Sequence, residues 1–386
     1  MRDQAPDRLP SQRHLFAMPR DLVYLNAAYM TPIVAAGEQA VARAAARRRT
    51  PWQTSPADFF TTSERVRGLA AQLFGATAED VALIPAVSYA AATVVRNLRP
   101  AAGQHILVLD QEFPSNRYPW HRLAQETGAQ VTVLEGSADQ DWTAAVLAAL
   151  STHGEAVALV AVPHCHWSTG RVLDLAAISQ AARGVGARLF VDLTQSLGAM
   201  SFDLAEVRPD YAVAAAYKWL FGPYGLAYFY VAPAHQGGVP VEENWIARAG
   251  SEDFSQLTRV TESYQPGSRR FDMGERSNFL TLPLAEQGLQ QVLDWRVERI
   301  EPSLRFHTQR LAEVFAAAGF TPVAEEARAA HLFGVRPPNG QSAADWNEHL
   351  RSRKVIASVR GNWIRISPHI WLDEADCDLV KTALTG

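Results

Sequence analysis

The chain has 386 residues, of which 48% are hydrophobic and 20% charged, and its formal net charge is −4. This length predicts about two or three domains, and the weak negative charge gives no reason to expect nucleic acid or an anionic membrane as a partner. No apolar run approaches the roughly 20 residues that span a bilayer. The two cysteines, Cys165 and Cys377, lie far apart without zinc-type spacing. We therefore expect no disulfide framework and a cytoplasmic location.

The first part of the chain is a polar, proline-containing arm followed by alternating helical and strand-like patterns. These patterns predict a short strand over 23–28, helices over 33–49 and 62–74, a strand over 81–84 and a helix over 90–98. Ser88 lies in the turn between the last two elements. Free backbone N–H groups and the helix dipole favour a phosphate group at such a turn. The alternative is that Ser88 only caps the helix, although a cap and a phosphate ligand use the same geometry.

Further along, the patterns predict a strand over 106–109, helices over 117–127 and 141–150, and a strand over 157–162. The loop after this last strand contains His164, Cys165 and His166. In an extended segment the two histidines would share one face and the cysteine would take the other, with no carboxylate nearby. This arrangement argues against a metal site.

Two apolar runs in the stretch 186–225 end on residues that carry chemistry. The first, Leu189–Val191, stops on Asp192, and the second ends on Tyr217 and Lys218. Continuous apolar runs indicate buried strands of a parallel sheet, and ligands of such sheets bind at the carboxyl ends of the strands. Burial lowers the pKa of a lysine, as an imine-forming amine requires.

The spacing Asp–x–x–Gln, followed 23 residues later by Lys, resembles the cofactor core of the class V aminotransferase family. These are pyridoxal-phosphate (PLP) enzymes of fold type I, and they include cysteine desulfurases, kynureninase and isopenicillin N epimerase. The resemblance implies that Lys218 forms the internal aldimine, Asp192 holds the pyridine nitrogen protonated and Gln195 hydrogen-bonds the ring hydroxyl. The alternative is a capping Asp, a surface Gln and a snorkelling Lys.

The resemblance also implies an α/β fold: a large domain with a mostly parallel seven-stranded sheet flanked by helices, and a smaller α+β C-terminal domain. We place an arm at 1–30, the large PLP-binding domain at 31–250 and the small domain at 251–386, against which the arm can pack. The pattern changes to mixed helices and strands near residue 300, as this division requires.

The resemblance also implies cofactor contacts for several further residues. Ser88 and Tyr89 correspond to the first phosphate contacts of the family, and the hydroxyl of Tyr217 would reach the phosphate as in kynureninase. Phe113, in a phrase that resembles the family's (E/D)xxxPSNxxPW segment, would stack on the pyridine ring. The alternative for Phe113 is a place in the core. Desulfurases carry a histidine there, and a phenylalanine cannot act as an acid or base.

A Gly- and Arg-rich loop over 264–279 resembles the family loop that contacts the phosphate of the partner subunit. Ser277 and Asn278 are its candidate donors, because the usual Gly–Thr is absent. The resemblance then implies a homodimer with shared active sites. The alternative is a surface loop with solvated arginines.

The phrase Trp363–Ile370 is similar to the family's (V/I)RISPHxYN. Its alternation sets Arg365 on the face opposite its isoleucines, where a rigid guanidinium can clamp the α-carboxylate of a substrate. A structural salt bridge is the alternative. The resemblance adds Asn26 near the active-site entrance, and Trp167 and Thr169 on the loop that closes over the substrate side.

The sequence argues against one of the reactions that PLP supports, the persulfide transfer of cysteine desulfurases. Desulfurases need a mobile cysteine shortly before the Arg365 strand, and residues 351–360 contain none. We expect an enzyme that binds an L-α-amino acid and removes its Cα proton, with Lys218 as the base. The leading interpretation is a β-eliminating C–S lyase of a cysteine conjugate. The alternatives are a transaminase, an epimerase or a decarboxylating deaminase, and last a relative without catalysis.

Overall fold

A seven-stranded sheet with the order β2–β8–β7–β6–β5–β3–β4 forms the centre of the protein. The computed structural model describes residues 7–135 and 141–385. Neighbouring strands are parallel except β8, which runs antiparallel to both β2 and β7. The strands are β2 (Val81–Ile84), β3 (His105–Leu109), β4 (Gln130–Leu134), β5 (Val157–Pro163), β6 (Arg188–Asp192), β7 (Tyr211–Ala215) and β8 (Ala227–Val231). The predicted mostly parallel seven-stranded sheet is confirmed.

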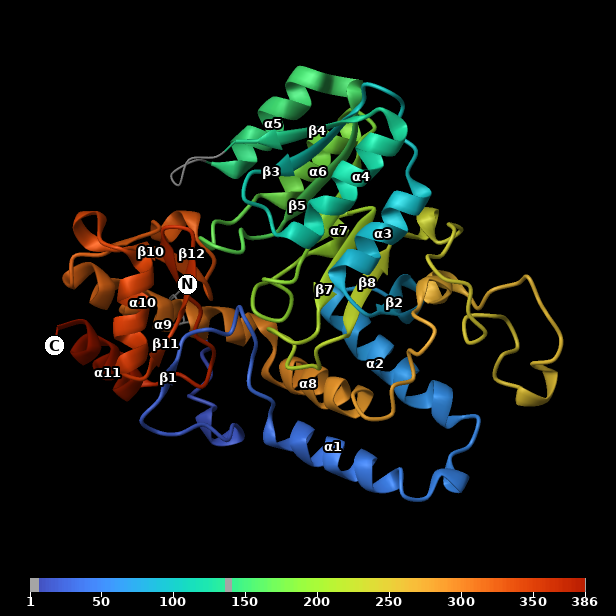
Figure 1. Ribbon diagram of the computed structural model, residues 1–386, viewed down its shortest axis with the longest axis horizontal. Helices are drawn as coiled ribbons and strands as arrows, with labels where there is room; N and C mark the ends of the chain where they lie inside the picture. Colours follow the sequence, from blue (N-terminus) through green and yellow to red (C-terminus); the bar gives the residue numbers. More distant parts are fainter. Residues whose placement is uncertain (1–6, 136–140, 386) are drawn as a thin grey trace, which may run out of the picture.

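Helices cover both faces of this sheet because successive strand residues point to opposite sides. On one face, Leu107 packs in a core with residues of α2, α5, α6 and α8. On the other, Ile106 packs with residues of α3 and α4 (Figure 1). The helices are α1 (Ala35–Arg47), α2 (Asp58–Phe74), α3 (Val87–Asn97), α4 (Tyr118–Thr127), α5 (Trp142–His153), α6 (Leu175–Gly184), α7 (Leu204–Val207) and α8 (Leu282–Trp295).

The smaller part of the protein is built on a four-stranded sheet of order β12–β13–β10–β9. Beside it, β1 near the N-terminus pairs in parallel with β11 near the C-terminus. Isoleucines of β13 pack with residues of the helices α9, α10 and α11 in a separate core. The elements are β1 (Val23–Tyr24), α9 (Val297–Ala317), β9 (Thr321–Pro322), β10 (Phe333–Arg336), α10 (Ala343–Ser352), β11 (Val355–Ile356), β12 (Ser358–Arg360), β13 (Trp363–Ile366) and α11 (Glu374–Thr385).

Helix α8 bears on the expected division of the chain. It belongs to the range 251–386, yet its Leu282 and Leu289 lie in the core beneath the seven-stranded sheet, and it packs against α1 and α2. The arm is joined to the small domain through β1. The division at residue 250 stays a prediction, and α8 is the element that a boundary at this point separates from its packing partners.

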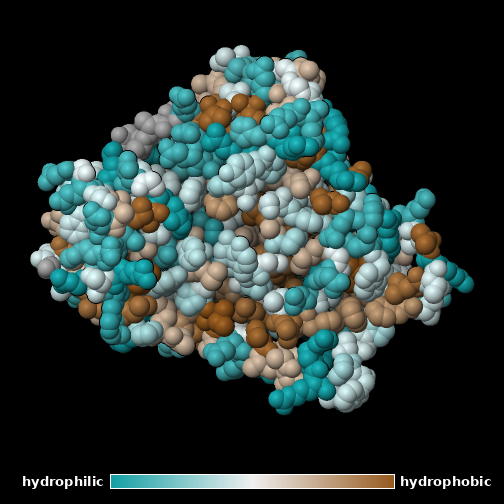
Figure 2. Space-filling view, in the orientation of Figure 1, coloured by the Kyte–Doolittle hydropathy of each residue, from teal (hydrophilic) through white to brown (hydrophobic). Residues whose placement is uncertain are grey.

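The surface is mostly hydrophilic on the face drawn in Figure 2, with apolar side chains gathered over the region of α8. Among the described residues, no helix combines the length and the hydrophobicity that crossing a membrane requires. Cys165 and Cys377 are both free thiols and both buried.

Candidate active site

A cavity of about 160 Å³ opens at the carboxyl ends of the parallel strands. Asp192 ends β6, Lys218 follows β7, and Glu112 and Phe113 follow β3. This is the edge of a parallel sheet at which ligands bind. The cavity is lined by Pro85, Ala86, Val87, Glu112, Phe113, Ser115, Pro163, Cys165, Trp167, Asp192, Thr194, Gln195, Ala215, Tyr217, Lys218, Tyr224, Gly225 and Leu226.

Lys218 is a buried amine with weakened basicity. Only 7% of the residue is exposed, and burial, aided by the Arg365 guanidinium, lowers its pKa to about 7. Its Nζ lies 5.6 Å from the centre of the Phe113 ring and 5.5 Å from that of Tyr217. Its backbone is fixed by Thr31, whose Oγ1 donates to the Lys218 carbonyl at 2.7 Å. A large share of the amine is therefore unprotonated near neutral pH, as a nucleophile requires.

Two buried carboxyl groups, those of Asp192 and Glu112, also line the cavity. Asp192 accepts a hydrogen bond from the Thr194 amide at 2.8 Å, and burial raises its pKa. Glu112 accepts from the Phe113 amide at 2.6 Å, and its Oε2 is buried without a hydrogen-bond partner in the described part of the chain. Burial, and next the Asp192 charge, raise the pKa of Glu112 to about 8. Glu112 received no role from the sequence, because it lies in the loop after β3, whereas Asp192 is itself the last residue of β6.

The amide of Gln195 has a defined orientation. Its Nε2 donates to the Ala28 carbonyl at 3.1 Å, and its Oε1 accepts from Trp219 Nε1 at 3.0 Å. Gln195 lines the cavity together with Asp192 and Lys218. The Asp–x–x–Gln…Lys spacing therefore brings three side chains to one site, and the alternative of a surface Gln and a snorkelling Lys is wrong.

The first turn of α3 reaches the cavity through its backbone. Ala86 is the N-cap and lines the cavity with Val87, whereas Ser88 is exposed in the first turn. The alternative role of Ser88 as a helix cap is wrong, because no side chain caps this helix. The Tyr89 hydroxyl donates to Glu242 Oε1 at 3.0 Å. The N-terminus of α3 is a candidate phosphate cradle, with Ser88 and Tyr89 beside it rather than in its wall.

Arg365 is a buried guanidinium whose hydrogen-bond donors are only partly satisfied. It is 1% exposed, and its Nη1 donates to the Trp167 carbonyl at 2.9 Å. Its Nε and Nη2 have no hydrogen-bond partner in the described part of the chain, nor does any carboxylate there form an ion pair with it. Burial and the neighbouring Arg360 lower its pKa to about 9. The salt-bridge alternative is therefore wrong, and the free donors suit an anionic ligand.

Trp167 joins this arginine to the rest of the site. Its Nε1 donates to the Gln111 carbonyl at 2.6 Å, and its ring meets Phe113 edge-on at 5.5 Å. Thr169 and Asn26 are buried but do not line the cavity. Thr169 Oγ1 lies 3.4 Å from His166 Nδ1, and Asn26 Oδ1 has no hydrogen-bond partner among the described residues.

Ser277 and Asn278 do not join this cavity within one chain. They line a separate cavity of about 370 Å³ between α1, α2 and α8. The Ser277 hydroxyl donates to the Phe59 carbonyl, and Asn278 Oδ1 accepts from the amides of Leu280 and Thr281 at 3.1 and 3.0 Å.

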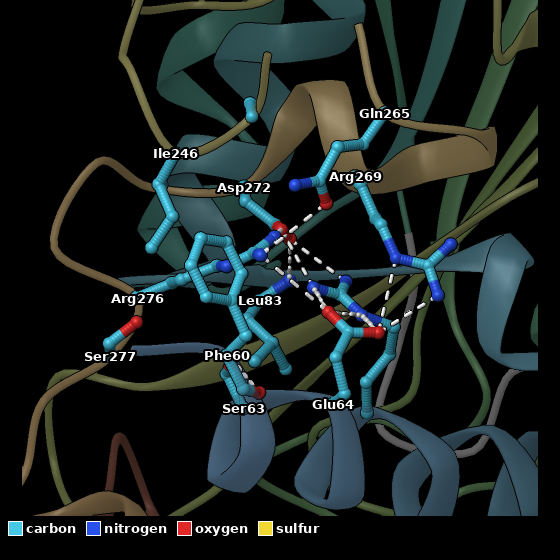
Figure 3. Close-up of polar contacts among 12 residues, drawn as sticks. Phe60, Ser63, Glu64, Leu83, Ile246, Gln265, Arg269, Asp272, Arg276 and Ser277 are labelled. Carbon is cyan, nitrogen blue, oxygen red and sulfur yellow. Dashed lines mark hydrogen bonds and ion pairs between the residues drawn. The ribbon is translucent and has the colours of Figure 1, made fainter. Parts of the chain in front are cut away.

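The loop that carries them is fixed by a buried ion cluster (Figure 3). Asp272 and Arg276 are fully buried and paired with each other, and Asp272 also pairs with Arg67 at 2.7 Å. At the rim, Arg269 contacts Glu64 at 2.8 Å. The alternative of solvated arginines is wrong for Arg276, because its guanidinium is buried against a carboxylate.

The family model described as aminotransferase class-V matches residues 30–358. The chain belongs to this family. Pyridoxal 5'-phosphate is its cofactor, and the protein is accordingly a PLP-dependent enzyme. The residues fit the group: a buried amine, a buried carboxylate, an aromatic ring and a helix N-terminus line one cavity. Within the described ranges no set of three or more His, Cys, Asp or Glu side chains is placed to hold a metal.

Several curated proteins are similar to this member of the class V family. An uncharacterized aminotransferase, YcbU, of Bacillus subtilis is 26% identical over 80% of this chain and 79% of its own length. Isopenicillin N epimerase of Amycolatopsis lactamdurans is 28% identical over 85% of each chain. Kynureninase of Deinococcus radiodurans is 27% identical over 70% of this chain and 65% of its own.

Solved structures share the fold. The cystine C–S lyase C-DES, in complex with its product cysteine persulfide, has a TM-score of 0.83 at 19% identity, and the likeness covers 95% of this chain and 97% of that one. The apo cysteine desulfurase of Thermococcus onnurineus has a TM-score of 0.81 at 16% identity, over 97% and 98% of the two chains. The fold type I architecture is therefore shown.

Proposed function

We propose that this class V enzyme is a β-eliminating lyase that acts on an L-α-amino acid or a cysteine conjugate and cleaves a C–S bond. One observation carries the proposal. A buried, weakly basic amine lines the cavity, and a buried guanidinium without a carboxylate partner among the described residues contacts Trp167 in the cavity wall; together they suit the amino and carboxylate ends of an amino acid.

The cofactor, when bound, supplies an electron sink that weakens the Cα–H bond of the substrate. Lys218 would hold the cofactor covalently and, once released from it, accept the Cα proton on Nζ. Asp192, at the floor of the cavity, would keep the pyridine nitrogen protonated. Phe113 would cover one face of the ring, and Arg365 would bind the α-carboxylate.

The thiols of the chain support elimination over persulfide transfer. Burial raises the pKa of Cys165 to about 12 and that of Cys377 to about 11, so neither is a thiolate at neutral pH. Elimination needs no protein nucleophile. The Cα proton goes to Lys218, the Cβ–S bond breaks with its electron pair on sulfur, and water converts the remaining fragment to pyruvate and ammonia.

Transamination is the second candidate, since one similar protein is named an aminotransferase. It needs the same Cα proton but returns it to the cofactor and requires a keto acid as acceptor. Phe113, which cannot carry a proton, favours neither reaction. Epimerisation and decarboxylating deamination are further alternatives that also begin at Cα.

We also propose that the enzyme works as a homodimer with shared active sites. Ser277 and Asn278 line a cavity remote from Lys218 in their own chain, so a phosphate contact from them requires a second copy. A neighbouring cavity that includes both residues is also lined by Trp245, 37% exposed, and Leu280, 43% exposed. Exposed apolar side chains at a polar-rimmed surface suit a subunit interface.

The proposal is tested by spectra and products of the purified enzyme. After PLP addition, a visible absorption band that is absent from the Lys218→Ala variant would support the role of the amine. Pyruvate and ammonia released from cysteine conjugates without a keto acid are the expected products. Conversion of the cofactor to a stable amine form that only a keto acid reverses would show a transaminase instead. Failure to bind PLP at all would contradict both.

A further inference from the structure

A second arginine, Arg360, contacts Trp167 of the cavity wall and takes no part in the proposed reaction. It ends β12 and pairs with Trp363 of β13, while Ser358 pairs with Arg365. Directly opposite residues of an antiparallel pair share a face, as do residues two apart on one strand. Arg360 and Arg365 therefore project from the same face of the small sheet.

That face is turned toward the cavity. The opposite face carries Ile364 and Ile366, which lie in the small-domain core. Arg365 donates to the Trp167 carbonyl at 2.9 Å, and the guanidinium carbon of Arg360 lies 5.3 Å from the centre of a Trp167 ring. Trp167 lines the cavity, so both guanidinium groups contact a residue of its wall, although neither arginine lines it directly.

Neither guanidinium forms an ion pair with a carboxylate of residues 7–135 or 141–385. Arg360 is half-buried; its Nη1 donates to the Val359 carbonyl at 2.7 Å, and its Nε is buried without a hydrogen-bond partner among these residues. Both positive charges act on Lys218. Two neighbouring positive charges whose N–H groups are not all hydrogen-bonded are complementary to anions.

We propose that Arg360 binds an anionic group at the end of the substrate's side chain while Arg365 holds the α-carboxylate. Diagonal positions across an antiparallel pair are about 7–8 Å apart, which suits two oxyanions of one ligand. The inference rests on the proposed function and narrows it to amino acids or conjugates whose side chain ends in a carboxylate or sulfonate. Arg360 is then a specificity-determining residue.

The competing role for Arg360 is structural: its stacking on Trp167 would fix the loop between β5 and α6. A structural role predicts that loss of the guanidinium weakens all ligands alike. A binding role predicts that it weakens only ligands with a second anionic group.

The test uses the PLP-loaded enzyme and ligands without an amino group, which bind but do not react. Calorimetry compares dicarboxylates from malonate to adipate with their monoamides. For the best dicarboxylate, Arg360→Gln is expected to lower affinity about 10- to 100-fold, as for loss of a charge-assisted hydrogen bond, and to leave its monoamide unchanged. Arg360→Lys should keep part of the preference. Arg353→Gln, which removes an exposed charge from the same domain, should change neither ligand.

Three results would overturn the inference: dicarboxylates that bind no better than monoamides, no binding of any dicarboxylate, or an equal loss for both ligand classes in Arg360→Gln. Arg365→Gln should weaken both classes, which shows that the ligands occupy the site. Because these ligands bind without reacting, the binding result can be interpreted even if the enzyme has no lyase activity. Conversely, pyruvate release with no anion preference would leave the lyase proposal standing.

Discussion

Individual residues define this site by being buried with their polar groups incompletely satisfied. Lys218, Glu112 and Arg365 each have a pKa moved from its ordinary value, and burial is the largest cause in every case. A structure that keeps such groups loses stability unless a ligand compensates. Perturbed groups that converge on one cavity therefore mark a functional site.

Glu112 allows a test at this scale that is independent of turnover. In the apoprotein the pKa of Glu112 in the folded state is about 8, above its ordinary value of 4.5, so the folded state holds the proton more tightly and stability falls as the pH rises between these values. The loss is at most about 1.4 kcal/mol per pH unit. Glu112→Gln should remove this decline. Urea unfolding across the pH range checks it, and parallel curves for both proteins would contradict it.

At the scale of elements, loops are held by buried charges as well as by apolar cores. Asp272 accepts from the Leu83 amide at 2.7 Å and pairs with both Arg67 and Arg276. The segment that ends at Ser277 is thereby tied to β2 and α2. Ordering this loop in advance reduces the entropy lost when it meets a ligand.

Asp272→Ala should destabilise the protein by about 3–5 kcal/mol, because two buried guanidinium groups lose their shared carboxylate. Glu126→Ala is the matched control: it removes a carboxylate from an exposed pair with Arg122 and should cost about 0.5 kcal/mol or less. Denaturant unfolding measures both. Similar losses for the two variants would show that the cluster does not anchor the loop.

The sequence was informative where local pattern and function coincide. Apolar runs located the strands, and their last residues located Asp192 and Lys218. It did not reveal that Arg276 is buried, because Arg67 of α2, which shares the Asp272 carboxylate with Arg276, is distant in the chain. Nor did it give Glu112 a role, since a carboxylate after a strand has no local mark of burial. Helix α3 begins at Val87 rather than at residue 90, because its N-cap is an alanine without a side-chain signal.

At the scale of the whole molecule, the proposed site draws on two parts of the protein: the residues that line the cavity lie between Pro85 and Leu226, and the two arginines come from β12 and β13. Arg365 and Arg360 come from the small domain, and Lys218 and Asp192 from the large one. Trp167 bridges them through its carbonyl and its ring. The position of the small domain relative to the large one therefore sets the distance between Arg365, the proposed ligand of the α-carboxylate, and Lys218.

Shared active sites predict complementation between two defective variants. Lys218→Ala lacks the amine, and a Ser277→Ala, Asn278→Ala double variant lacks the proposed partner contacts. In a mixed dimer, one site would combine an intact Lys218 with an intact Ser277–Asn278 pair. Since half of randomly mixed dimers are mixed, activity should return to about a quarter of the wild-type value for a two-fold symmetric dimer. No recovery after subunit exchange, verified by mass spectrometry, would refute sharing.

The parallel pair β1–β11 has a consequence for how the chain folds. Val23 pairs with Val355, so one of the first strands to be synthesised has its partner near the end of the chain. Contacts of such long sequence separation close late and fold slowly. During synthesis the large domain can fold before β11 has been made, and β1 is unpaired in this interval. Pairing of β1 with another chain can then compete with its pairing to β11. Deleting the N-terminal strand would thus alter refolding yield as well as final stability.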